Sequence, residues 1–160
     1  MNRNGRRLIS VCLAAALVMF GLGLPTPTRA EVITNAKVPF SLGVFIPCVP
    51  EVVVLTGELH VLMSQEVDSD GGIHVKTHFQ PQGISGVGSV TGDKYQGTGG
   101  TQEHFNIHSS PAIEDTFVNN FRIIGQGSGN NFLVHTTFHV TINAEGVITA
   151  DVLNDSTECK

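Results

Sequence analysis

Positive charge is scarce beyond the first thirty residues of this sequence. Four of the nine basic residues, and none of the fourteen acidic ones, lie within residues 1–30. The other 130 residues therefore carry five basic and fourteen acidic side chains, a net charge of −9 with the histidines neutral. A surface this acidic repels phosphate backbones and anionic lipid headgroups. We expect neither nucleic acid nor a membrane surface as a partner of this region.

Long apolar runs are also scarce, and the clearest one covers residues 8–24. Three arginines precede it, and a short stretch of small and proline residues ending at Ala30 follows it. This layout predicts a secretory signal peptide over residues 1–30, and hence a secreted or periplasmic protein. The alternative is an uncleaved membrane anchor, for which a run of this length lies at the lower limit.

Cysteine is the third scarce residue, because only Cys48 and Cys159 lie beyond residue 30. An even pair in an exported protein predicts one disulfide. Cys48 lies in a proline-flanked loop and Cys159 is the penultimate residue, so the bridge would tie the C-terminal tail to the front of the domain. Two free thiols are the alternative. A cysteine nucleophile is not supported, since neither cysteine has a neighbouring base in the sequence.

No segment shows the periodicity of an amphipathic helix, whereas residues 117–142 read as one long β-hairpin. Its connector, residues 125–131, is rich in glycine and asparagine, which suit a chain reversal. In the second arm, apolar and polar residues alternate. One face carries Phe132, Val134, Thr136, Phe138, Val140 and Ile142, and the other carries Leu133, His135, Thr137, His139 and Thr141. The alternation predicts one dry and one polar face.

Other strands are expected over residues 32–40 with an extension at 44–46, 51–65, 73–80, 84–91, 101–109 and 147–153, with a short one within 92–100 and one helical turn over 110–115. These elements predict a single all-β domain over residues 31–160. About eight strands and a bend at Gly57 favour an antiparallel β-barrel, in which closure removes exposed edges. A β-sandwich is the alternative.

Seven histidines lie beyond residue 30, and six of them form pairs spaced by four. The pairs are His74 and His78, His104 and His108, and His135 and His139. Such a pair shares a face of a strand but lies about 13 Å apart, too far for one metal ion. Histidines on adjacent strands are close enough, so His78, His104 and His135 could converge on Zn²⁺ or Cu²⁺.

That convergence requires the three histidine-bearing strands to be neighbours, and a metal site would need supporting partners. Glu58, Asn106 and Thr137 are the candidates for these partners. The alternative is that the histidines line the solvated face of the sheet, which would leave the protein without a metal cofactor.

Arg122 is the only arginine beyond residue 30. In an enclosed pocket, Arg122, Asn119, Asn120 and Tyr95 are candidates for orienting an apolar ligand. The alternative for Arg122 is a surface side chain whose head reaches solvent. Two serine motifs lack the glycines of a nucleophile elbow, and the glycine-rich runs lack the helix that a phosphate loop requires.

Four segments carry a resemblance to small exported bacterial all-β proteins that have no assigned function. They are Gly-Glu-Leu-His at 57–60, His-Phe-Gln-Pro-Gln-Gly at 78–83, Lys-Tyr-Gln-Gly-Thr-Gly at 94–99 and Phe-Val-Asn-Asn-Phe-Arg at 117–122. The architecture is also similar to the allene oxide cyclase and dirigent type of barrel. No functional residue of that group matches a position here, so this second likeness implies an architecture and no activity.

Three functions are compatible with these features. The first is an exported β-barrel that binds a small, mostly apolar ligand. The second is a lyase or cyclase of the allene oxide cyclase or dirigent kind. The third is a structural or adhesive surface protein without a pocket. The sequence leaves the oligomeric state open.

Overall fold

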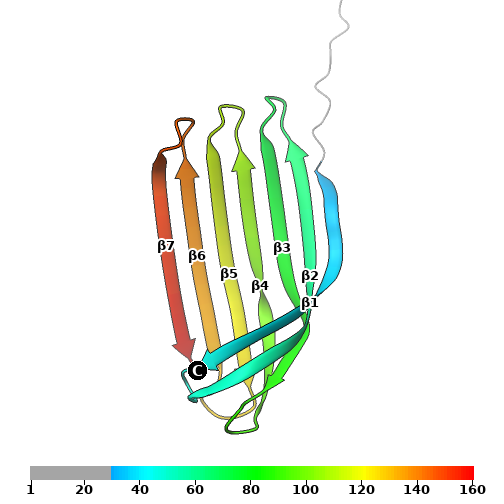
Figure 1. Cartoon of the computed structure of the whole chain (residues 1–160), viewed down its shortest axis with the longest axis vertical. Coiled ribbons are helices and arrows are strands. Elements are labelled where there is room, and N and C mark those ends of the chain that lie inside the picture. Colours follow the sequence, from blue (N-terminus) through cyan, green and yellow to red (C-terminus); the bar gives the residue numbers. More distant parts are fainter. Residues whose placement is uncertain (1–29) are drawn as a thin grey trace, which may run out of the picture.

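A computed structural model describes residues 30–160 of the chain. The predicted signal peptide falls on residues that lie almost wholly outside this part, so it stays a prediction. The described residues form one antiparallel sheet in which each strand pairs with the next along the chain (Figure 1). Its strands are β1 (Glu31–Ile46), β2 (Glu51–Val67), β3 (Ile73–Val87), β4 (Lys94–Ile107), β5 (Ile113–Gly125), β6 (Phe132–Ile142) and β7 (Ile148–Cys159).

The all-β prediction is confirmed, but the predicted barrel is not, because the sheet is not closed. The structure has a single sheet rather than the two sheets of a sandwich. The expectation of about eight strands is corrected to seven. Residues 73–80 and 84–91 were expected as separate strands, whereas β3 runs without interruption from Ile73 to Val87. Likewise, β4 joins the short strand expected within 92–100 to the one expected over 101–109.

The helical turn expected over residues 110–115 is wrong. The chain there makes a tight link between β4 and β5, and β5 already begins at Ile113. The His108 N–H donates to the carbonyl of Ala112 over 2.9 Å, which closes the link as a hairpin connection. Pairing between the long strands β4 and β5 overrides the local helix signal.

Gly57 is the point at which β2 bends. The register between β2 and β3 shifts between Thr56 and Glu58, as expected for an irregularity at this glycine. A side chain at position 57 would place its Cβ 2.7 Å from the Cα of Ile84, so only glycine allows the two strands to approach this closely. Beyond the bend, β1 and β2 cross the lower end of the sheet toward the end of β7 (Figure 1).

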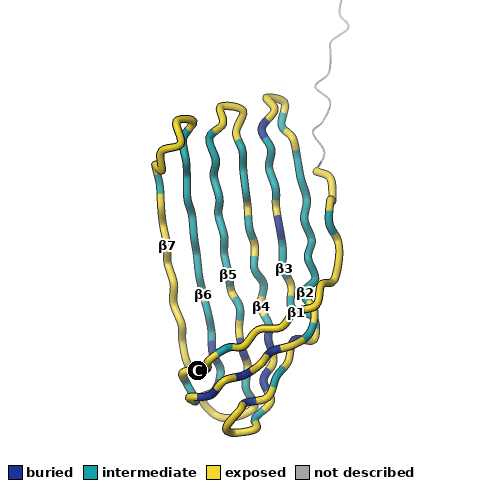
Figure 2. The backbone as a smooth tube through the Cα atoms, in the orientation of Figure 1, coloured by how far each residue is buried: buried dark blue, intermediate teal, exposed yellow. Residues whose placement is uncertain are grey.

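The core lies at this lower end, between the folded-over part of the β1–β2 hairpin and the ends of β3–β6. Figure 2 shows most of the buried residues gathered there. Phe40 of β1 faces Phe121 of β5 across the core boundary, with ring centroids 6.5 Å apart. Higher up, the sheet is a single layer of mostly half-buried residues. The buried apolar core consists of Ile46, Val53, Leu55, Ile84, Tyr95, Ile123 and Phe132.

The predicted disulfide between Cys48 and Cys159 is present. It ties the tip of the β1–β2 hairpin to the last residue of β7 and closes a loop with a sequence separation of 111. Main-chain hydrogen bonds of 3.0 and 2.9 Å between Asn131 and Lys160 hold the same corner. A disulfide is compatible with an oxidising compartment outside the cytoplasm.

Candidate functional site

An open cavity of about 390 Å³ lies where the folded-over hairpin meets the apolar face of the sheet. Side chains from β1 through β6 contribute to it, because the bend at Gly57 brings β1 opposite β5. Nine of its lining residues are apolar, and the other two are Thr101 and Asn119. The apolar lining residues are Phe40, Leu42, Val44, Leu59, Phe79, Phe117, Phe121, Ile123 and Val134.

The polar pair in this cavity is joined by a hydrogen bond. The Thr101 hydroxyl donates to Oδ1 of Asn119 over 2.8 Å, and the two residues are directly paired across β4 and β5. This bond fixes the orientation of the Asn119 amide, whose NH₂ group is a donor. An apolar wall with one positioned polar group is the usual composition of a small-molecule site.

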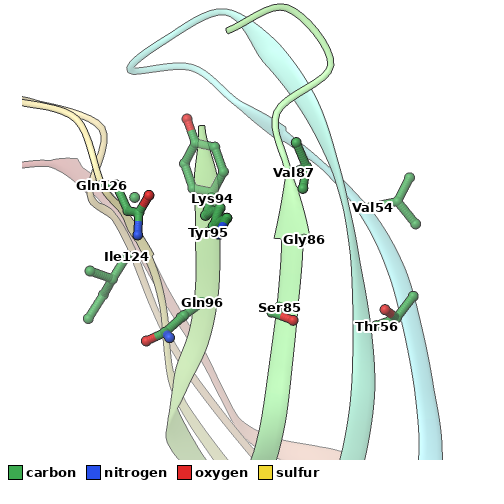
Figure 3. Close-up of a pocket in the computed structure, with 11 residues that line it drawn as sticks. Val54, Thr56, Ser85, Gly86, Val87, Lys94, Tyr95, Gln96, Ile124 and Gln126 are labelled. Atoms are coloured by element: carbon green, nitrogen blue, oxygen red, sulfur yellow. The ribbon is translucent and has the colours of Figure 1, made fainter. Parts of the chain in front are cut away.

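A second, larger hollow of about 720 Å³ lies on the outer side of the core (Figure 3). Val54 and Ile124 line it, and both alternate along their strands with buried residues, so they point away from the core. The other side chains come from neighbouring strands and are mainly polar. They include Thr56, Ser85, Lys94, Gln96 and Gln126, together with Val87 and Tyr95. This composition suits solvent better than an apolar ligand.

The four residues predicted to orient a ligand lie in three different places. Asn119 lines the apolar cavity, whereas Tyr95 belongs to the core and touches the outer hollow. Asn120 and Arg122 lie on the opposite face of β5, where they line a small cavity of about 170 Å³ beside β6 and β7. The structure therefore brings only Asn119 to the apolar cavity, and the other three are not part of it.

All seven histidines lie on the polar face of the sheet, opposite the core face. The strand register places them there. Each histidine either pairs with a residue of the polar face or lies two residues along the chain from one. His135 and His139, for example, lie opposite Asn120 and Thr116 of β5. The predicted division of the β6 side chains between two faces is thus confirmed. The apolar face is half-buried rather than dry, because Phe132 is the only buried residue of β6.

The three histidines proposed as metal ligands are not brought together. His78 pairs with Gln102 of β4, while His104 pairs with Thr116 and His135 with Asn120 of β5. They therefore occupy three levels of the sheet, and β5 separates β4 from β6. Within residues 30–160, no group of three or more His, Cys, Asp or Glu side chains is arranged to hold a metal ion.

The supporting partners predicted for that metal site have other roles. Glu58 forms an exposed ion pair with Lys37 at 3.8 Å. Thr137 lies 3.3 Å from His135 through its hydroxyl. Asn106 bonds to His74, which is not one of the three histidines proposed as ligands.

His74 is the centre of a polar network at the end of the sheet farthest from the disulfide. Its Nε2 lies 3.1 Å from Oδ2 of Asp68, and its Nδ1 lies 2.9 Å from Oδ1 of Asn106. The Asn106 NH₂ group donates to Glu114, so its oxygen is the atom that faces His74. Both ring nitrogens of His74 thus face acceptors, an arrangement that suits the imidazolium. The hydrogen bonds to Asn106 and Asp68 raise the pKa of His74, and the bond from His74 lowers the pKa of Asp68.

Glu114 extends this network to two further histidines. Its carboxylate lies 3.9 Å from Nε2 of His108 and 3.9 Å from Nε2 of His139. The His139 ring also bonds to Thr116 over 2.8 Å. The network therefore joins the ends of β3–β6 on the polar face.

No family model, curated protein or solved structure matches this chain. The resemblance to small exported bacterial proteins and the architectural likeness to the cyclase and dirigent barrels therefore stay predictions. Within residues 30–160, no helix is long and apolar enough to cross a membrane.

Glu51 is the polar residue that sequence reasoning missed. It is 2% exposed and lies at the start of β2, in the same corner as the disulfide. Its carboxylate accepts hydrogen bonds from the Tyr95 hydroxyl at 2.7 Å, from the Thr91 hydroxyl at 2.9 Å, and from the N–H groups of Val90 and Thr91 at 3.0 Å each. A detectable signal was present: Glu51 shares the strand parity of Val53 and Leu55, which are both buried.

These bonds explain the ionisation of the pair. The Tyr95 hydroxyl, followed by the N–H of Thr91, lowers the pKa of Glu51 to about 2. Burial, followed by the bond to Glu51, raises the pKa of Tyr95 to about 12. Glu51 is thus a carboxylate and Tyr95 a phenol throughout the neutral range. Because its acceptor sites are filled by the protein, Glu51 holds the β3–β4 turn in place and is poorly suited to acid–base catalysis.

Proposed function

We propose that this chain is a secreted or periplasmic β-domain that binds a small, mostly apolar ligand beneath the β1–β2 hairpin. The apolar cavity of about 390 Å³ is the observation that carries the proposal. Its volume falls in the range of small-molecule sites, and its walls come from both the sheet and the hairpin folded over it. The disulfide holds that hairpin against the sheet, so we propose that the domain works as a barrel left open on one side.

The lining of the cavity favours binding over catalysis. None of the eleven described residues that line it is titratable, so it offers no general acid or base to a bound molecule. Asn119 is placed to donate a hydrogen bond to a carbonyl or hydroxyl oxygen on the ligand. A purely structural or adhesive protein with a filled interior would also lack such an open cavity.

A titration with N-phenyl-1-naphthylamine, an uncharged apolar fluorophore, tests this proposal. We expect saturable fluorescence enhancement with one probe per chain. Leu42→Trp should weaken binding at least about tenfold, because Leu42 lines the cavity and is 45% exposed, so a larger ring can enter the cavity without entering the core.

Val54→Trp is the matched control, since Val54 is 56% exposed and lines only the outer hollow. This variant should bind the probe as the unsubstituted protein does. Equal weakening by both substitutions, or no saturable binding, would contradict the proposal. Asn119→Leu should weaken a probe carrying a carbonyl group but not a hydrocarbon probe.

A further inference from the structure

The two edges of the open sheet differ in their ability to accept another strand. In the described part of the chain, β1 pairs only with β2, and β7 pairs only with β6, so each leaves one row of main-chain groups unpaired. The β1 edge carries Pro39, which has no N–H, and its register is irregular between Val32 and Thr34. Both features block strand addition, as does the charge of Lys37.

The β7 edge lacks two of these features, the proline and the lysine. Its twelve residues include no proline and no lysine, and the irregularity in its pairing lies at its start, beside Ile142. Almost all of β7 is exposed, as its position at the margin of the sheet shows (Figure 2). The disulfide at Cys159 and the main-chain bonds of Lys160 fix its far end. A preformed strand of this length loses little conformational entropy when another strand pairs with it.

The side chains of β7 specify which strand can pair. Asp151, Leu153 and Asp155 alternate on the apolar face of the sheet, opposite Val140, Phe138 and Thr136 of β6. Leu153 is 66% exposed, which leaves a large apolar side chain without cover between two acids. The described strands carry four cations, Lys37, Lys76, Lys94 and Arg122, and the register places all four on the side of the polar face. The apolar face therefore offers these acids no basic partner.

This pattern disfavours a second copy of the chain as the partner. Pairing of β7 with β7 would bring the carboxylates of Asp151 and Asp155 from both copies onto one face, and like charges across strands destabilise pairing. Pairing with β1 of another copy would present Val38 and Phe40 to the acids, because Lys37 lies on the other face of β1. Charge complementarity therefore selects a basic partner.

We propose that β7 is a docking strand for an extended basic segment of another protein, which adds to the sheet antiparallel to β7. The segment would carry lysine or arginine at two positions four residues apart, opposite Asp151 and Asp155, and an apolar residue midway, opposite Leu153. Directly opposite residues have Cβ atoms about 5 Å apart, within reach of an ion pair. This site shares no residue with the apolar cavity, so strand docking and the proposed ligand binding can be tested independently of each other.

The experiment uses residues 31–160 of the chain and the fluorescently labelled peptide Thr-Val-Lys-Thr-Leu-Thr-Lys-Val-Thr, with its C-terminus amidated. Fluorescence anisotropy should show saturable binding below 1 mM peptide. Two further peptides carry N-methyl groups on alternate residues, one for each edge of the peptide strand. Strand addition predicts that one of them loses binding and the other keeps it, since only one edge faces β7. Equal binding of both, or no binding of the parent peptide, would overturn the proposal.

Protein variants separate specific pairing from general charge attraction. Asp151→Asn with Asp155→Asn should weaken the parent peptide about tenfold, because each cross-strand ion pair contributes up to about fivefold. The Asn at position 155 can still accept the hydrogen bond from Thr136, so the sheet should stay intact. Glu31→Gln with Asp70→Asn changes the net charge equally at the start of β1 and in the β2–β3 turn, away from β7, and should leave the affinity unchanged. Equal weakening by both double variants would contradict docking on β7.

Discussion

Glu51 shows how a single buried carboxylate organises a corner of this molecule. Its partners are the Tyr95 hydroxyl and the Val90 and Thr91 groups of the turn between β3 and β4. A side chain at Gly88 would collide with the carboxylate, so the turn fits closely around it. The turn therefore depends on an ionised Glu51.

We expect Glu51→Gln to lower the midpoint of thermal unfolding by several degrees at pH 7. The amide would turn its NH₂ group toward the donors that now face the carboxylate, leaving them without an acceptor. Glu58→Gln is the control, since the Glu58 side chain is 53% exposed. Because the folded pKa of Glu51 lies near 2, below the ordinary value of 4.5, its contribution is present above pH 4.5 and lost as the pH falls toward 2.

The difference in unfolding midpoint between Glu51→Gln and the unsubstituted protein should therefore shrink as the pH is lowered from 4.5 toward 2. Thermal unfolding followed by circular dichroism from pH 2 to pH 7 measures it. A constant difference across this range would mean that ionisation of Glu51 does not stabilise the fold.

His74 should show the opposite pH dependence. Its folded pKa is raised above 6.5 by Asn106 and Asp68, so its contribution is fully present below pH 6.5 and is lost as the pH rises through the folded pKa. We expect His74→Gln to destabilise the protein at pH 5.5 and to have less effect at pH 8.5. His78→Gln, on the same strand and face, is the matched control. An imidazole pKa of 6.5 or lower for His74, measured by NMR titration, would contradict this expectation.

At the scale of the element, residue periodicity predicted strands better than it predicted their ends. The second arm of the hairpin, residues 132–142, matches β6 at both ends, because its alternation is strict. The sequence predicts two strands in place of β3, because Pro81 and Gly83 resemble a strand terminator. In the structure, pairing between β3 and β4 lapses between Phe79 and Ser85, so the missing N–H of Pro81 costs no bond to β4 there.

Gly97 allows close packing between strands at a position that residue periodicity does not identify. A Cβ at this position would lie 2.7 Å from Cγ2 of Ile84 and 2.8 Å from Cζ of Phe121. The side chains of β3 and β5 thus meet over bare backbone of β4. Such contacts depend on which strands are neighbours, which a sequence alone does not state.

We expect Gly97→Ala to lower the free energy of unfolding by about 1–3 kcal/mol, the usual range for an overpacked core. Gly43→Ala is the control, because no atom lies within 4 Å of the Cβ that it would add. Urea denaturation of both variants measures the effect. Equal stability of the two would show that Ile84 and Phe121 can move aside without loss.

For the whole molecule, the sequence predicted the disulfide but not the position of the apolar cavity. The even number of cysteines beyond residue 30 and the predicted export signal sufficed for the bridge. The cavity depends on β1 folding over β5, which follows from the bend at Gly57 and from the bridge together. Periodicity places Asn119 and Asn120 on opposite faces, but it does not say which face the hairpin covers, so these residues were grouped as one site.

The disulfide should be the main support of that folded-over arrangement. Closing a loop with a separation of 111 stabilises the folded state by about 5 kcal/mol on the chain-entropy model. We expect the double variant Cys48→Ser and Cys159→Ser to lose a large part of this in urea denaturation. A loss below about 1 kcal/mol would show that core packing alone holds the hairpin in place.

Methyl NMR of residues 31–160, titrated with N-phenyl-1-naphthylamine, tests most directly where the ligand binds. We expect the chemical-shift changes to concentrate on methyl groups that line the apolar cavity, among them those of Val44, Leu59 and Val134. The methyls of Val54 and Val87, which line the outer hollow, should stay in place. Shifts confined to the outer hollow, or spread evenly over exposed methyl groups, would contradict the claim that the cavity beneath the β1–β2 hairpin is the binding site.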